Sequence, residues 1–94
     1  MNIPKTKEEC FATLDEMLSD EDKQAIIEMD DVFKLHFTLG MWIRNNWIYK
    51  QSDEESRALI KSLGEEDEEK LFYHPDDYST IILEAYKKHL MSKI

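Results

Sequence analysis

The feature that most constrains the fold is one stretch, Asp31 to Trp47, in which apolar side chains fall on nearly every helical face. Its apolar members are Val32, Phe33, Leu35, Phe37, Leu39, Met41, Trp42, Ile43 and Trp47. Lys34, Thr38 and Asn45 form a single narrow polar stripe. A helix that is apolar almost all round is covered by other elements. The sequence therefore predicts a central helix over Asp31–Trp47, with the polar stripe facing solvent.

Two residues inside this stretch need a tertiary explanation. Gly40 costs about 1 kcal/mol relative to alanine in a helix interior, which predicts a close approach by another helix. Arg44 follows the apolar run, and a buried arginine needs a partner. Asp76 and Asp77, expected at the start of the last helix, are the natural candidates. The hypothesis is a contact between Arg44 and a carboxylate that fastens the last helix to the central one.

Capping residues predict the other helix starts. Thr6 with Glu9, Ser19 and Ser52 with Glu55 stand before amphipathic segments. The expected helices run over about 7–18, from Ser19 toward residue 30, and over about 53–63. A last helix, capped by Asp77, continues close to the C-terminus.

The chain has 94 residues, only two glycines and two prolines, which argues against a turn-rich β protein. We expect one helical domain over residues 1–94. The predicted fold class is all-α, a compact orthogonal bundle of about five helices around a central apolar helix.

The formal net charge of −9 disfavours nucleic acid and anionic membranes as partners. It favours a basic protein partner, or serves solubility alone. Cys10 is the single cysteine, so no intrachain disulfide forms, and we expect it in the core. No segment has the pattern of a signal peptide or a bilayer-spanning helix. These features predict a cytoplasmic protein.

Two segments together resemble a known family. The first is the run from His36 to Trp47, HFTLGMWIRNNW, and the second is the run from His74 to Ser79, HPDDYS. The pair is similar to a family of short bacterial proteins of unknown function with LGxxIRNxW-type and HPDDxS-type segments. The opening Ile3–Thr6 is also similar. The resemblance implies a bacterial source and a helical domain, and it implies no activity.

A polar cluster is the first candidate site. His36, Gly40 and Arg44 share one helical face, and the segment containing His74, Asp76 and Asp77 is expected nearby. The spacing matches no zinc or calcium loop, so we expect no metal and no cofactor. His36 is expected to bond to backbone, and a pair of His74 with Asp76 is an alternative acid–base arrangement. Neither Ser79 nor Cys10 has an assured base, so no catalytic residue is assigned.

The end of the central helix is the second candidate site, with Asn46, Trp47 and Tyr49 as candidate binding residues. Tryptophan and tyrosine are enriched at binding hot spots, although core packing is their commoner role. The leading hypothesis is a non-enzymatic protein-interaction domain, with a basic partner or a second copy in a homodimer. A sharper version is an acidic inhibitor of the immunity-protein type. The alternative is a small-ligand or enzymatic site on Arg44, His74 and Asp76 or Asp77.

Overall fold

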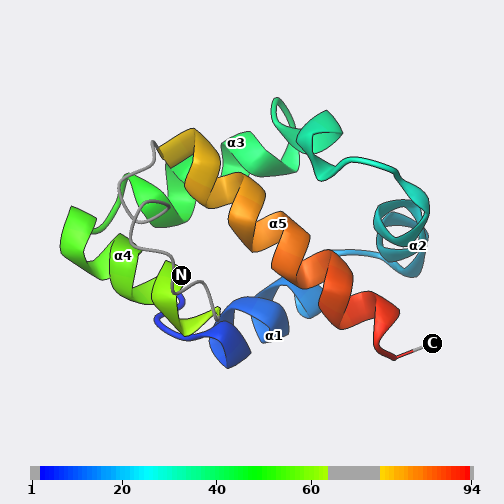
Figure 1. The fold of residues 1–94 in the computed structure, drawn as a ribbon, viewed down its shortest axis with the longest axis horizontal. Helices are drawn as coiled ribbons and strands as arrows, with labels where there is room; N and C mark the ends of the chain where they lie inside the picture. The colour runs from blue at the N-terminus through cyan, green and yellow to red at the C-terminus, as the bar shows by residue number, and fades with distance from the viewer. Residues whose placement is uncertain (1–2, 64–74, 94) are drawn as a thin grey trace.

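The computed structural model describes residues 3–63 and 75–93, and this part of the chain is helical and contains no β-strand (Figure 1). Its α-helices are α1 (Lys7–Met17), α2 (Asp20–Glu28), α3 (Leu39–Ile43), α4 (Asp53–Ser62) and α5 (Pro75–Met91). A 3₁₀ helix, η1 (Val32–Leu35), precedes α3, and a π-helical segment, η2 (Arg44–Ile48), follows it directly. The predicted all-α fold class is confirmed.

Helices α2 and α4 begin where the sequence predicts because each has a complete capping box. Ser19 Oγ accepts from the Asp22 amide, and Ser52 Oγ accepts from the Glu55 amide, both at 3.1 Å. The two carboxylates accept in return from the amides of the capping serines. Backbone donors that would otherwise lack partners are therefore satisfied at both helix starts.

The start of α1 has a different arrangement. Thr6 Oγ1 accepts from the Glu9 amide at 3.3 Å as predicted, but the Glu9 carboxylate accepts from the amide of Lys5 at 2.9 Å. Lys5 Nζ lies 2.6 Å from the Glu55 carboxylate and 3.3 Å from Gln51 Oε1. The N-terminal segment is thereby attached to the start of α4.

The stretch predicted as one central helix, residues 31–47, is interrupted. The Asp31 carboxylate accepts from the Phe33 amide at 2.9 Å and starts η1, and residues 36–38 form a turn. The backbone of Thr38 (φ −118°, ψ −101°) lies outside the helical region. The interrupted part contains the residue types that lose side-chain freedom in a helix: Val32, Phe33, Phe37 and Thr38. The prediction of one continuous helix is therefore wrong in its first half.

Helix α5 has the central position that the sequence analysis gave to residues 31–47. It contacts α2, η1, α3, η2 and α4, and the ring of Tyr86 lies 5.8 Å from that of Phe11 on α1. Figure 1 shows α5 crossing the middle of the molecule, with α3 on one side and α1 on the other. Its buried apolar side chains are Tyr78, Ile82, Leu83, Tyr86 and Leu90. By contrast, Phe33 and Phe37 in the 31–47 stretch are 54% and 75% exposed.

Two other expectations from the sequence are confirmed. Lys34, Thr38 and Asn45 are each exposed to solvent, although they lie on η1, on the turn and on η2 and form no stripe on one helix. Cys10 is fully buried, and burial raises the pKa of its thiol to about 12, so this cysteine is a neutral core residue.

Candidate functional site

Arg44 stands at the junction of α3 and η2 and is only 6% exposed. Its Nη1 donates to Ser79 Oγ on α5 at 2.9 Å, and its Nη2 donates to the carbonyl oxygen of His36 at 2.9 Å. Nη1 also lies 3.4 Å from His36 Nδ1. Since a guanidinium only donates, this ring nitrogen is the acceptor in the contact. We call Arg44, His36 and Ser79 the arginine clamp.

The arginine clamp joins the two segments that carry the family resemblance. Arg44 belongs to the first segment and Ser79 to the second, 35 residues further on. Ser79 is 1% exposed, and the sequence analysis did not propose it as a partner for Arg44. Its position at the end of the HPDDYS segment was the available signal. The predicted fastening of α5 to the α3 region is thus carried, among the described side chains, by a serine hydroxyl.

Gly40 fits beneath this clamp. A Cβ at this position would lie 3.0 Å from the carbonyl oxygen of Leu35 and 3.3 Å from Arg44 Nη1. The close approach predicted at Gly40 is present, and it comes from Leu35, the last residue of η1, and from the Arg44 side chain.

The hydrogen bonds of the clamp hold the α3 region against α5. Ser79 Oγ is the acceptor in its hydrogen bond with Arg44. The carbonyl oxygen of His36 accepts from the Arg44 side chain, whereas a hydrogen bond between the His36 ring and backbone stays a prediction. These contacts fix residues 36–38 against α5.

The other candidate residues occupy different environments. Trp47 is fully buried, so the core interpretation holds for it, and its Nε1 has no hydrogen-bond partner in the described part of the chain. Asn46 is half-buried and donates to the Trp42 carbonyl oxygen at 2.9 Å. Tyr49 is 58% exposed at the end of η2.

The candidates on the second motif segment are only partly within the described chain. His74 and the side chain of Asp76 lie outside the described residues. Asp77 is exposed in the first turn of α5, because this helix begins at Pro75. A proline suits the first helical position, where its missing N–H is not needed. Asp77 is therefore not the helix cap that the sequence analysis predicted, and its pairing with Arg44 remains a prediction.

An exposed aromatic cluster sits directly on the segment that the clamp holds. The ring of Phe33 stacks on that of His36 at 4.8 Å, and the ring of Phe37 meets His36 edge-on at 4.8 Å. We call Phe33, His36 and Phe37 the aromatic turn. Sequence periodicity missed its exposure, because a continuous buried helix was predicted here.

A groove opens on the same segment. It has a volume of about 370 Å³ and runs between the end of α1, helix α2 and the η1–α3 segment. Most of its wall is apolar and includes Met17, Ile26, Met29, Leu35, Leu39 and Trp42. Asp22 and Thr38 contribute polar atoms. We call it the α2 groove.

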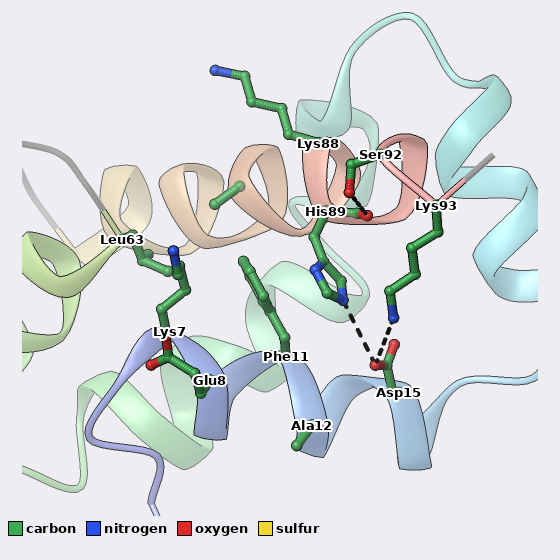
Figure 2. Close-up of a pocket in the computed structure, with 11 residues that line it drawn as sticks. Lys7, Glu8, Phe11, Ala12, Asp15, Leu63, Lys88, His89, Ser92 and Lys93 are labelled. Atoms are coloured by element: carbon green, nitrogen blue, oxygen red, sulfur yellow. Dashed lines mark hydrogen bonds and ion pairs between the residues drawn. The ribbon is translucent and has the colours of Figure 1, made fainter.

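A second pocket, of about 590 Å³, lies between α1 and α5 (Figure 2). Asp15 in this pocket accepts from Tyr86 Oη at 2.8 Å, and it lies 3.8 Å from His89 Nε2 and 3.7 Å from Lys93 Nζ. Figure 2 shows the His89 and Lys93 side chains directed at Asp15. The Phe11 ring stacks on His89 at 4.4 Å. The contacts of Asp15 and Phe11 in this pocket therefore join α1 to α5.

The fold and the arginine clamp define a small all-helical domain whose two motif segments meet at a buried arginine. The chain belongs to the family described as Domain of unknown function (DUF6794), which matches residues 3–90. The predicted membership in a family of unknown function is confirmed. No curated protein and no solved structure matches the chain. None of the helices in the described ranges is long and apolar enough to cross a bilayer.

Proposed function

We propose that this protein is a non-enzymatic interaction domain that binds a basic protein through its η1–α3 segment. The observation that carries the proposal is the aromatic turn, where Phe33 and Phe37 are 54% and 75% exposed and both pack on His36. Clustered exposed aromatic side chains mark interaction surfaces more often than scattered ones. Large aromatic side chains also supply much of the binding energy at protein interfaces.

The arginine clamp supports this proposal because it makes the aromatic turn rigid. Arg44 Nη2 holds the backbone of His36, which lies between the two exposed phenylalanines. A surface that is already ordered loses less conformational entropy when it binds. On this view Arg44 positions the binding surface from below and does not contact the partner.

The charge of the chain supports a basic partner. A net charge of −9 attracts a positively charged protein and raises its rate of association. An acidic inhibitor of the immunity-protein type is one form of such a domain. Self-association as a homodimer is disfavoured by the same charge, because two copies repel each other.

Site-specific photo-crosslinking tests the proposal. A benzoylphenylalanine in place of Phe37, within cells of the source organism, should give an adduct with a basic protein. The matched control places the same group at Ala58, an exposed position on α4, and should give no such adduct. The Phe33→Ala change should weaken the adduct formed at position 37.

Light scattering over a concentration series completes the test. A monomer at every concentration is the expected result. A crosslinked dimer of the chain through position 37, with a matching dimer mass in solution, would replace the proposal with self-association. Equal labelling from positions 37 and 58 would mean that the aromatic turn is not a binding surface.

A further inference from the structure

We infer that the α2 groove binds one amphipathic helix of the partner, with apolar side chains in the groove and lysines or arginines on both flanks. This inference rests on the proposed function and specifies the element that is recognised. The groove is built from α2 on one side and from Leu35, Leu39 and Trp42 on the other. The segment that bears the aromatic turn thus also forms one groove wall.

The groove has the size and polarity for such a helix. Its volume of about 370 Å³ is more than twice that of a cavity of about 150 Å³ that accepts benzene. It can therefore take two or three large apolar side chains, as a helix presents at positions i, i+4 and i+7. Met17 on the groove wall is 40% exposed, so apolar surface remains open to an occupant.

The polar atoms of the groove favour a helix over an extended peptide. An extended peptide needs partners for its backbone N–H and C=O groups, usually from a strand edge, and the described chain has no strand. Thr38 Oγ1 already donates to the Leu35 carbonyl oxygen, and the Asp22 carboxylate caps α2. A helix satisfies its own backbone groups and requires none of these atoms.

Charge complementarity favours basic flanks. Seven acidic residues that surround α2 in the sequence are exposed, and none forms an ion pair with a described residue: Glu16, Asp20, Glu21, Asp22, Glu28, Asp30 and Asp31. The same stretch contains a single cationic side chain, Lys23. An occupant with cationic flanks would neutralise part of this charge, whereas an acidic occupant would be repelled.

The experiment uses three synthetic peptides of about 16 residues, a length that supports some helix in water. The first has leucines at helical spacing with lysine flanks. The second has glutamates in place of the lysines, and the third has the lysines but scrambled leucines. None contains tryptophan, so a change in the tryptophan fluorescence of the intact chain, which has Trp42 on the groove wall and Trp47 beside it, reports binding. We expect micromolar binding of the first peptide only, and weaker binding at higher salt.

Matched variants locate the bound peptide. Ala25 is exposed on α2 and lines the groove, so Ala25→Arg fills it with a long cationic side chain. Ala25→Gln fills it without adding charge. Ala58→Arg makes the same charge change on α4, which Figure 1 shows at the opposite end of the molecule from α2. Both changes at Ala25 should weaken binding at least tenfold, and the change at Ala58 should weaken it less than twofold.

Each contrary outcome has a distinct meaning. Equal binding of the scrambled peptide would show charge-driven adsorption and overturn the helix inference. Equal weakening by Ala25→Arg and Ala58→Arg would remove the groove from the binding site. If no peptide binds but position 37 still crosslinks a basic protein, the helix inference fails and the proposed function stands. If both experiments fail, the proposed function fails as well.

Discussion

At the scale of single residues, Arg44 decides how the two motif segments meet. It is buried, and its fork of donors reaches Ser79 Oγ and the His36 carbonyl oxygen at the same time. Lysine has a single ammonium group and cannot reproduce this planar geometry. The Arg44→Lys change should therefore lower the free energy of unfolding by about 2 kcal/mol.

Urea denaturation measures this loss. Lys61→Arg is the control, since Lys61 is exposed on α4 and its change should alter the free energy of unfolding by under about 0.5 kcal/mol. An Arg44→Lys protein as stable as the unmodified chain would show that the clamp does not hold the segments together.

Gly40 is the second residue whose role depends on the clamp. Alanine gains about 1 kcal/mol of helix propensity, but overpacking costs about 1–3 kcal/mol. The Leu35 carbonyl oxygen, 3.0 Å from the added Cβ, belongs to backbone and has little room to move. We expect Gly40→Ala to lower the free energy of unfolding by about 1 kcal/mol in urea denaturation. An increase in the free energy of unfolding would mean that the Leu35 backbone moves away from the added Cβ at little cost.

At the scale of elements, the helix starts are independent local units. Ser19 and Ser52 cap α2 and α4 through the same reciprocal hydrogen bonds. Replacing either serine by alanine should cost about 1 kcal/mol, and the double variant about 2 kcal/mol, because distant sites add. Thermal unfolding measures the three variants. Ser92→Ala, which removes an exposed hydroxyl beyond the end of α5, should cost under about 0.5 kcal/mol.

Elements also show where local signals and packing disagree. The predicted caps Thr6, Ser19 and Ser52 stand directly before the observed starts of α1, α2 and α4, because a cap involves neighbouring residues only. The interruption at residues 36–38 had no such local marker. Hydrophobic periodicity fits a helix there, but Arg44 and Ser79 hold the turn from a distance.

For the caps, a loss of unfolding free energy in the Ser19→Ala, Ser52→Ala double variant that differs from the sum of the two single losses would show that the two helix starts are not independent.

At the scale of the whole molecule, Asp15 connects the two ends of the chain. Burial alone would raise its pKa, but the hydrogen bond from Tyr86 and the nearby cations outweigh this effect and lower it. A carboxylate with a lowered folded-state pKa adds stability above its unfolded pKa of about 3.9. That contribution is lost as the pH falls through the folded-state value.

The comparison of Asp15→Asn with the unmodified chain tests this connection. The variant should be less stable near neutral pH. The difference should shrink as the pH falls from about 4 through the lowered folded-state pKa of Asp15, below which the unmodified carboxylate is neutral too. Urea denaturation at several pH values gives the two curves. Glu16→Gln makes the same kind of change at an exposed neighbour and is the control, with an expected difference of under about 0.5 kcal/mol near neutral pH. If the difference in the free energy of unfolding between Asp15→Asn and the unmodified chain is the same at every pH, the charge of Asp15 is not the source of its stabilising effect.

The second connection across the molecule joins the N-terminal segment to α4. The hydrogen bond from Lys5, together with those from Ser52, lowers the pKa of Glu55 to about 2. The Glu55 carboxylate is therefore ionised above about pH 2. Sequence reasoning assigned Glu55 only to a helix cap, because Lys5 lies 50 residues away along the chain.

The sequence by itself determined the helical class, the helix starts at the caps, the buried Cys10 and the acidic character of the surface. These properties follow from neighbouring residues or from composition, so no tertiary knowledge is required. The tertiary structure alone decided that α5 is central, that Ser79 accepts from Arg44, and that Phe33 and Phe37 face solvent. Each of these depends on which distant segment covers a helix face. The apolar periodicity of a sequence predicts that a helix face is buried, but it does not predict which segment packs on that face.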